Sequence, residues 1–365
     1  MHALQIVAGQ RAYQRIRERG LRATDVRAVL GASGGPKWFV LSHLDRELAR
    51  SFLPQNTRNI QLVGSSIGAW RMACHAAADP VGALKRLEEA YLQQRFAKGA
   101  SPQHVSAQCE AMLLEVLGDE YSMQANRPLN IITARCKGAT ADERRLRQAL
   151  AFAWVATGNL ASRKTLRWHF DRHIVQSEPG TLPVDHFSDF HTTVSKLTHS
   201  NVLPALMASG AIPLALAGVE NIPGCSAGVY RDGGMVDYHF DLPFNTPDGV
   251  VLYPHFAPML KPGWFDKSLH WRKVNEQHYQ DVVLITPSPE FIEKLPHGKL
   301  PDRRDFQRMT DQDRMAYWRK AVSSGERLAE EFHDWVARGA TGSIVMPFKP
   351  EHYARLGTSI QKKAS

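Results

Sequence analysis

The chain has few cysteines and no apparent secretory signal, the features that are typical of secreted proteins and of proteins with thiolate metal sites. Its 365 residues include only four cysteines, and no C-x-x-C pair occurs among Cys74, Cys109, Cys136 and Cys225. This spacing is neither a disulfide framework nor a thiolate metal site, so we expect a reducing compartment. The N-terminal segment lacks the apolar core of a secretory signal and is rich in arginine, which predicts a cytoplasmic protein.

Uninterrupted apolar runs of membrane-spanning length are also missing. The longest stretch without Asp, Glu, Lys or Arg, Leu197–Val219, is broken by Pro204, Gly210 and Pro213. These interruptions favour a buried helix followed by a loop over a membrane span. No internal repeat and no Gly/Ser-rich or Pro-rich linker is evident, so the sequence offers no sharp domain boundary.

The composition that is present suits a globular protein. Hydrophobic residues make up 43% of the chain and charged residues 22%, and a chain of about 300 residues buries roughly three quarters of its unfolded surface. The 45 basic and 36 acidic residues leave a net charge of +9, which favours anionic partners. No zinc-finger, RNP or helix-turn-helix signature accompanies this charge, so we expect no nucleic acid among them.

Short apolar segments alternate with segments of helical spacing. We predict strands at residues 26–32, 59–64, 128–137, 250–253 and 281–286, and helices at residues 37–52, 68–78, 81–96 and 105–117. Parallel neighbouring strands need crossover connections, which such helices supply. The alternation therefore predicts an α/β protein with a mainly parallel central sheet covered on both faces.

We expect three regions along the chain. Residues 8–19 have helical spacing and many arginines, so residues 1–25 are predicted to form an N-terminal basic helix. Residues 26–250 carry the alternating pattern and form the predicted core. Residues 251–365 change character and include a long amphipathic segment from Asp313 to Gly339, which predicts a C-terminal extension packed on the core.

The strongest local signal is Gly64-Ser65-Ser66-Ile67-Gly68, a G-x-S-x-G between a predicted strand and a predicted helix. In this context the motif is typical of a nucleophile elbow, in which a sharp turn projects a serine hydroxyl above a helix N-terminus. The turn needs small residues two positions before and after the serine. Ser66 is therefore the candidate nucleophile, and an ordinary glycine-containing turn is the alternative.

A glycine-rich loop, GASGGPKW, follows the first predicted strand at residues 31–38. It is not a phosphate-binding P-loop, because Trp38 stands where that motif requires Ser or Thr, and it does not match G-x-G-x-x-G. A glycine pair on a neighbouring loop supplies unobstructed backbone N–H donors to an oxyanion. We therefore predict that Gly34 and Gly35 form an oxyanion hole, with a plain connecting turn as the alternative.

A third segment, Asp232-Gly233-Gly234, places a carboxylate beside two glycines that free the backbone. Asp232 is therefore a candidate general base.

Taken in this order, the three segments resemble the patatin-like phospholipase family. The family pattern is a Gly-rich oxyanion loop, G-x-S-x-G, and a D-G-G or D-G-A that carries the aspartate of a Ser-Asp dyad. A fourth segment, ASGAIP at residues 208–213, is similar to the A-S-x-A-x-P stretch of the family. The resemblance covers about residues 26–243 and implies a patatin-like three-layer α/β/α sandwich.

The oxyanion loop departs from the family pattern at two positions. Patatins commonly have G-G-G-x-R/K-G, whereas this chain has Ser33 and Trp38 in place of the first and last glycines. Lys37 retains the basic position, and the resemblance implies that it binds the substrate or an anion. Pro36 has no N–H to donate, and the bulk of Trp38 is expected to narrow the acyl or headgroup site.

The resemblance implies a serine acyl hydrolase that acts on lipid or related esters without a metal or organic cofactor. Asp232 would accept the Ser66 proton directly, and Gly34 and Gly35 would hold the oxyanion. One alternative is a non-catalytic lipid- or protein-binding member of the same fold. Another is an α/β-hydrolase-type triad of Ser66, Asp232 and either His239 or His255, although only two predicted strands precede Ser66.

Two further patterns bear on metals and membranes. His169 and His173 have the i, i+4 spacing of a helical zinc pair, but the H-E-x-x-H glutamate and a third ligand are missing, so we expect no metal. Two groups could contact an anionic membrane surface: Arg11, Arg15, Arg17, Arg19 and Arg22, and Trp264, Phe265, Leu269 and Trp271 beside Lys261, Lys267, Arg272 and Lys273. A solvated helix face and packing onto the core are the ordinary alternatives.

Overall fold

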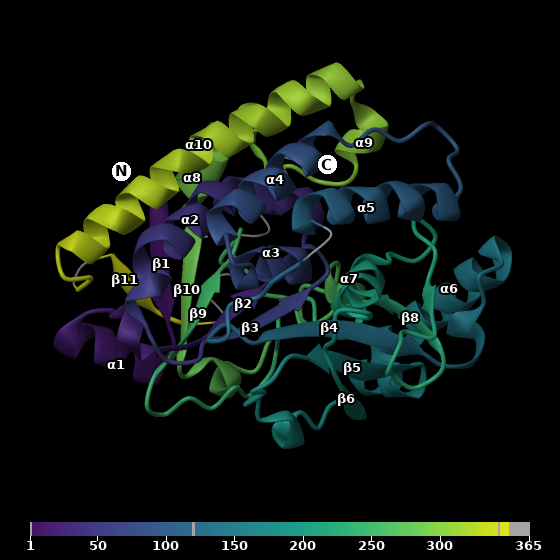
Figure 1. The fold of residues 1–365 in the computed structure, drawn as a ribbon, viewed down its shortest axis with the longest axis horizontal. Coiled ribbons are helices and arrows are strands. Elements are labelled where there is room, and N and C mark those ends of the chain that lie inside the picture. Colours follow the sequence, from purple (N-terminus) through teal and green to yellow (C-terminus); the bar gives the residue numbers. More distant parts are fainter. Residues whose placement is uncertain (1, 119–120, 342–343, 350–365) are drawn as a thin grey trace.

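The computed structural model describes residues 2–118, 121–341 and 344–349, which form an α/β fold (Figure 1). The strands are β1 (Leu4–Ala8), β2 (Val26–Gly31), β3 (Gln61–Ser65), β4 (Leu129–Cys136), β5 (Phe170–Gln176), β6 (Thr192–Lys196), β7 (Val219–Glu220), β8 (Val229–Asp232), β9 (Val250–Pro254), β10 (Val282–Pro287) and β11 (Val345–Pro347). The helices are α1 (Gln10–Arg19), α2 (Ser42–Glu47), α3 (Ile67–Ala76), α4 (Pro80–Gln93), α5 (Pro102–Leu117), α6 (Arg145–Ala161), α7 (Val202–Gly210), α8 (Pro289–Lys294), α9 (Asp305–Arg308) and α10 (Asp311–Ala337).

The strands form one mixed sheet with helices flanking it. The strand order is β11–β1–β10–β9–β2–β3–β4–β5–β6, with β8 beside β4 and β7 beside β8. The run from β10 to β4 is parallel throughout. In Figure 1, α2, α3, α4, α5 and α10 gather above the sheet, and α1 lies at its lower left. This is the layered arrangement of an α/β sandwich.

The sheet forms because its middle strands are apolar or small on both faces. All five residues of β3 and all six residues of β10 are buried. Strands covered on both faces have continuous apolar runs and not an alternating pattern, which is why short uncharged segments marked them in the sequence.

Several helices begin at a polar capping residue followed by proline. The Asp79 side chain accepts a hydrogen bond from the Gly82 N–H at 2.9 Å at the start of α4, and Ser101 caps α5 through the His104 N–H at 3.2 Å. Such residues satisfy N–H groups that the first turn leaves unpaired, and proline fits the first helical position because it has no N–H.

Most of the predicted elements are confirmed. The five predicted strands correspond to β2, β3, β4, β9 and β10, and the helices predicted at residues 68–78, 81–96 and 105–117 correspond to α3, α4 and α5. The amphipathic segment from Asp313 to Gly339 lies within α10 apart from its last two residues. Residues 37–52 are helical but divided among a 3-10 helix (Gly35–Leu41), α2 and a π-helical turn (Leu48–Phe52).

Two expected regions differ from the structure. Residues 1–25 do not form only a basic helix, because Leu4–Ala8 is a sheet strand that pairs with β10 and β11. Residues 251–365 are not an extension added to a finished core, because β9 lies between β2 and β10 inside the sheet. Leu4–Ala8 was not among the predicted strands. β9 was predicted, but a local sequence pattern that locates a strand does not specify its neighbours in the sheet. Within the described part of the chain, no helix combines the length and apolar character needed to cross a membrane.

Candidate active site

The strand register brings the sequence motifs to one edge of the sheet. Gly31 at the end of β2 pairs with Gly64 of β3. β3 is paired with β4, and Thr133 of β4 lies opposite Asp232 at the end of β8. The carboxyl ends of parallel strands share an edge, where loops converge to form sites. This places the glycine-rich loop after β2 beside Ser66 after β3. β8 runs antiparallel to β4, and Asp232 joins them through the register, because Ser65 pairs with Ile132, the residue before Thr133.

Ser66 occupies a strained turn between β3 and α3. Its φ of 58° and ψ of −133° are unfavourable for a residue with a side chain. The Ser66 N–H donates to Ser209 Oγ at 2.9 Å, and that hydroxyl donates to the Ile132 carbonyl at 2.7 Å. Gly68 lets α3 approach β2, because a Cβ there would lie 1.7 Å from the Gly31 carbonyl oxygen. The predicted elbow geometry is present at Ser66.

The Ser66 hydroxyl and the Asp232 carboxylate form a direct pair. Ser66 Oγ donates to Asp232 Oδ2 at 2.9 Å, and Asp232 Oδ1 accepts from the Gly234 N–H at 2.7 Å. Burial raises the pKa of Asp232 above its ordinary 3.8, while Arg303 and the two hydrogen bonds act in the opposite direction. A carboxylate with a raised pKa is a better proton acceptor, so the pair has the geometry of a nucleophile and its base.

The glycine-rich loop lies beside Ser66. Gly35 lines the same cavity as Ser66 and has a φ of 56°, which suits glycine, whereas Gly34 directly precedes it and is not among the residues that line the cavity. Within the described residues, no acceptor is assigned to the N–H of Gly34 or of Gly35. Ile67 also lines the cavity, and in nucleophile elbows the residue after the nucleophile donates its N–H to the oxyanion. Ile67 is not among the residues predicted from the sequence, although its place in the motif identifies it.

The two histidines considered as triad members do not reach the dyad. His239 Nδ1 accepts from the Lys261 N–H at 2.9 Å, and His255 Nδ1 bonds to the backbone two residues further on. Burial lowers the pKa of His255 to about 3 and that of His239 well below its ordinary value. Among the described residues, no hydrogen bond joins a histidine to Ser66 or Asp232. The geometry favours a dyad over a Ser-Asp-His triad.

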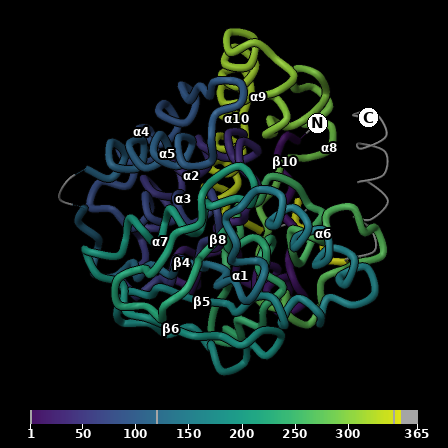
Figure 2. Tube along the Cα trace, turned by 90° about the vertical axis from the view of Figure 1, so that its right-hand side faces the viewer, coloured from purple at the N-terminus to yellow at the C-terminus, as the bar shows by residue number. Residues whose placement is uncertain are grey.

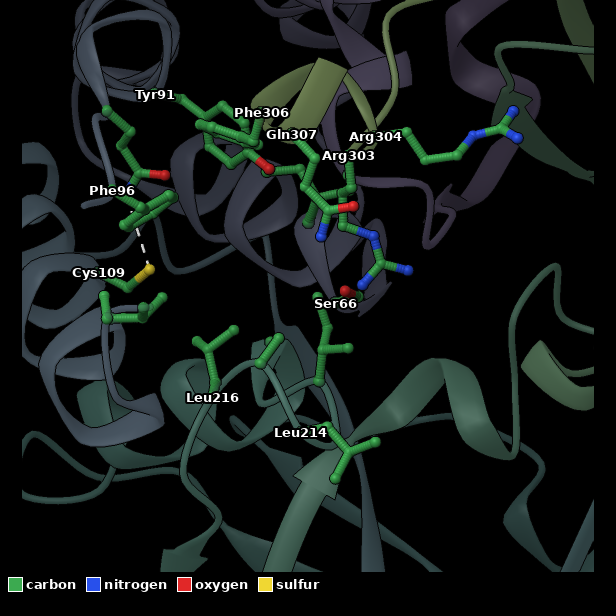
Figure 3. Close-up of a pocket in the computed structure, with 18 of the residues that line it drawn as sticks. Ser66, Tyr91, Phe96, Cys109, Leu214, Leu216, Arg303, Arg304, Phe306 and Gln307 are labelled. Atoms are coloured by element: carbon green, nitrogen blue, oxygen red, sulfur yellow. Dashed lines mark hydrogen bonds between the residues drawn. The ribbon is translucent and has the colours of Figure 1, made fainter. Parts of the chain in front are cut away.

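Ser66 opens onto a cavity of about 700 Å³ (Figure 3). The cavity is walled by α4, α5, the segment after α7 and the segment around α9. Apolar side chains dominate the walls, among them Ile67, Trp70, Phe96, Ile212, Leu216 and Phe306. A pocket of this size with apolar walls and a few polar groups at one point is typical of a small-molecule site.

Arg303 brings a positive charge to the dyad. It lines the cavity and points toward Ser66, whereas Arg304 points away (Figure 3). Among the residues that the structure describes, no carboxylate forms an ion pair with the Arg303 guanidinium. Arg303 is not among the residues predicted from the sequence, because no local motif marks it and it lies outside the segment that carries the family resemblance.

Two lysines lie further from the cavity. Lys37, expected to bind the substrate or an anion, is absent from the cavity walls, and its Nζ lies 5.1 Å from the centroid of the Phe256 ring. Lys267 Nζ lies 4.1 Å from the Tyr238 ring centroid. Burial lowers the pKa of each lysine to about 8. Arg303, and not Lys37, is therefore the cation that faces the cavity beside Ser66.

The segment Ala208–Pro213, singled out by the family resemblance alone, supports both members of the dyad. Its Ser209 hydroxyl accepts a hydrogen bond from the Ser66 N–H, and its Ala211 carbonyl accepts one from the Asp232 N–H at 3.1 Å. The structure thus gives this weak sequence signal a physical role.

His169 and His173, whose spacing suits a helix, do not lie on one. His173 lies within β5, and His169 directly precedes that strand. His173 Nδ1 is 2.6 Å from Thr193 Oγ1, and burial lowers the pKa of His173 to about 4. The described residues contain no group of three or more His, Cys, Asp or Glu side chains that could hold a metal ion.

The side chains expected at a membrane surface are mostly engaged within the chain. Arg11 forms an ion pair with Asp281 at 2.6 Å, and Arg19 pairs with Asp25 at 2.8 Å. Leu269 is buried and Trp264 lines the cavity. Trp271, in contrast, is 64% exposed.

In comparisons with known proteins, neither a protein-family model nor a curated protein matches the chain.

Proposed function

We propose that the protein is a patatin-like serine acyl hydrolase that cleaves carboxylic ester bonds of lipids. The observation that carries the proposal is the 2.9 Å hydrogen bond from Ser66 Oγ to Asp232, formed in a strained elbow that opens onto an apolar cavity. The order of the oxyanion loop, the G-x-S-x-G and the D-G-G supports the family assignment.

In the first half of the reaction, Asp232 accepts the Ser66 hydroxyl proton as Oγ attacks the ester carbonyl carbon. The carbonyl oxygen becomes an oxyanion, which the N–H groups of Gly34, Gly35 and Ile67 stabilise. The ester C–O bond then breaks, and the proton on Asp232 passes to the leaving alcohol. The acyl group remains bound to Ser66.

In the second half, a water molecule gives a proton to Asp232 and attacks the acyl carbon. The second oxyanion collapses, the bond to Ser66 Oγ breaks, and the proton returns from Asp232 to Ser66. The products are a carboxylic acid and an alcohol. All proton transfers use one carboxylate, which is why the direct contact of Asp232 with Ser66 matters.

The walls of the site also suggest which part of the substrate lies where. We place the acyl chain against the apolar walls formed by Phe96, Leu216 and Phe306. Arg303 lies at the Ser66 end of the cavity, where a phosphate or carboxylate of the alcohol portion would meet a positive charge. The substrate class is therefore an acyl ester with an anionic group.

Fluorophosphonate labelling followed by peptide mass spectrometry tests the dyad without knowledge of the substrate. We expect the label on Ser66, no label on that peptide in Ser66→Ala, and labelling about 10²–10⁴-fold slower in Asp232→Asn. Asp248→Asn, at an exposed carboxylate far from the dyad, is the control and should label like wild type. A label on another serine, or none on a folded protein, would contradict the proposal and favour a non-catalytic binding protein.

A further inference from the structure

The outward face of α6 is apolar where a surface helix is normally charged. Leu146, Leu150 and Trp154 follow one another at four-residue spacing and therefore share one face. Together with Leu160 their exposed fractions run from 54% to 73%, and residues 148–161 include no charged side chain. The opposite face packs inward through Phe152 and other buried residues. The helix thus has a second apolar face with no partner in the described structure.

Two further exposed tryptophans lie on segments that contact α6. Trp168 ends the 3-10 helix Arg163–Trp168, which packs on the end of α6 where a Cβ on Gly158 would lie 3.2 Å from Thr165 Oγ1. Trp271 lies nearby, because its neighbour Arg272 donates to the Asn159 carbonyl of α6 at 2.8 Å. We call the six side chains the α6 surface: Leu146, Leu150, Trp154, Leu160, Trp168 and Trp271.

The clustering of these six residues sets them apart from other exposed apolar side chains. Among the described residues, the remaining large hydrophobic side chains that are exposed lie between 36% and 46%, all below the least exposed member of the α6 surface. Contiguous exposed apolar patches mark interaction sites, whereas scattered single residues need no explanation.

The charge around the α6 surface is positive. Residues 144–170 contain no Asp or Glu, and they contain Arg144, Arg145, Arg147, Arg163, Lys164 and Arg167. Arg145, Lys164 and Arg167 are exposed, and within the described residues no carboxylate forms an ion pair with them. The nearest acidic residues are already paired, Asp142 with Arg144 at 2.6 Å and Glu143 with Arg231.

The α6 surface borders the Ser66 cavity. Gln148 of α6 accepts a hydrogen bond from the N–H of cavity-lining Leu214 at 2.8 Å. Asn159 of α6 donates to Asp266 at 2.9 Å, in the same short segment as cavity-lining Trp264. α6 lies at the right-hand end of the molecule in Figure 1 and on the side that faces the viewer in Figure 2.

We propose that the α6 surface docks on an anionic lipid bilayer and that docking brings the Ser66 cavity to the membrane. Leucine and tryptophan at the level of the headgroups, surrounded by unpaired cations, are the chemistry by which amphipathic helices lie in a bilayer interface. A protein partner of matching surface would have to supply acidic residues around an apolar centre. An anionic bilayer supplies the negative charge and the apolar interior, and its lipids also carry the ester bond. The delivery of substrate to Ser66 rests on the proposed function, whereas membrane binding by the α6 surface does not.

Flotation with lipid vesicles tests this surface in a Ser66→Ala background, so that lipid is not consumed. We expect binding to phosphatidylcholine vesicles that contain phosphatidylglycerol, and weaker binding to phosphatidylcholine alone. Leu150→Ser with Trp154→Ser should lower the partition coefficient about tenfold or more, because two interfacial apolar side chains are lost. Leu114→Ser with Met346→Ser removes two exposed apolar side chains elsewhere and should leave binding unchanged.

The electrostatic part is tested with Lys164→Glu and Arg167→Glu, which should weaken binding to the anionic vesicles. Arg319→Glu and Lys320→Glu on α10 make the same charge change away from the α6 surface and should have less effect. Equal unfolding midpoints establish that each variant is folded.

Three results would overturn the inference. The first is wild-type-like flotation of Leu150→Ser with Trp154→Ser, and the second is no flotation of the parent protein. The third is a dimer in light scattering that this double substitution dissociates, which would assign the surface to a second copy of the chain. Failure of the proposed function is separate, because it would appear as loss of Ser66 labelling and not as loss of flotation.

Discussion

At the scale of single residues, the candidate site combines backbone strain with a buried charge. Ser66 is held in an unfavourable conformation by the Ser209 hydroxyl and by the close packing of Gly68. Asp232 is buried beside it, and burial alone would favour the neutral carboxyl. Arg303 and the hydrogen bonds to Asp232 favour the charged form, which is the form that accepts a proton.

The acid limb of activity should report the pKa of Asp232. kcat/KM should rise with pH as Asp232 loses its proton, with a midpoint above the ordinary 3.8 because burial raises this pKa. Arg303→Gln removes a charge that lowers the pKa, so the limb should move to higher pH. The measurement is the pH dependence of ester hydrolysis for wild type and variant.

Arg304→Gln is the matched control for Arg303→Gln. Arg304 also lines the cavity but points away from Ser66 (Figure 3), so its removal should shift the limb less. Equal shifts in the two variants, or a limb at the pH of an ordinary aspartate, would contradict the assignment of Asp232 as the base.

At the scale of elements, a buried ion pair joins α2 to the helix that carries the elbow. Arg71 of α3 donates two hydrogen bonds of 2.8 Å to Asp45 of α2, and both side chains are fully buried. Burial raises the pKa of Asp45, but Arg71 and His75 outweigh this effect and lower it to about 2. The pair therefore helps to fix α3, and with it Ser66, against the neighbouring layer.

Asp45→Asn should destabilise the protein by about 3–5 kcal/mol, because it leaves the Arg71 charge buried without a partner. Urea unfolding at neutral pH measures this loss. In wild type the contribution of Asp45 should be complete above about pH 4, its unfolded pKa, and should fade as pH falls toward its folded pKa of about 2.

The exposed pair of Asp334 and Arg338 on α10 supplies the control for Asp45. Asp334→Asn should change stability little, since exposed ion pairs are screened by water. If Asp45→Asn were as mild as Asp334→Asn, α2 and α3 would not depend on the buried pair.

Another element, α10, supports the glycine-rich loop from outside the expected core. Gly325 of α10 packs so closely on the 3-10 helix Gly35–Leu41 that a Cβ there would lie 2.4 Å from the Val40 carbonyl oxygen. Trp318 of the same helix is fully buried and lies against Phe39. The C-terminal region thus helps to position Gly35, which no local pattern around either segment indicated.

At the scale of the whole molecule, the two chain ends complete the sheet. β1 and β11 pair with each other at one side of it, and β9 and β10 lie between β1 and β2. A fragment of residues 26–250 would lack nearly all of this part of the sheet and the cover of α10. It would expose the edge of β2, which is buried in the full chain.

We therefore expect the fragment of residues 26–250 to lack a cooperative unfolding transition. Circular dichroism during urea unfolding, with the full chain as the reference, is the measurement. A monomeric fragment that unfolds cooperatively would show instead that the region outlined by the sequence motifs is an independent domain.

Local sequence properties predicted much of the site. Apolar runs bounded by glycine placed β2 and β3, and G-x-S-x-G and D-G-G identified Ser66 and Asp232, because a sharp strand-to-helix turn restricts which residues fit. No element was predicted at His169 and His173, whose spacing of four suits a helix; His173 lies in β5 and His169 directly precedes it. α6 was not predicted either, because its two apolar faces give no clear amphipathic period.

What the sequence alone determined were the short-range features: the α/β class, the strands that flank the elbow, and the residue types the turns require. Only the tertiary structure decided the strand order, the direct contact of Ser66 with Asp232, the place of Arg303 in the cavity and the exposure of the α6 surface. The physical reason is the distance along the chain over which each effect acts. Turn geometry and periodicity act over a few neighbouring residues, whereas Ser66, Asp232 and Arg303 come from distant parts of the chain and meet only when the whole sheet has closed around them.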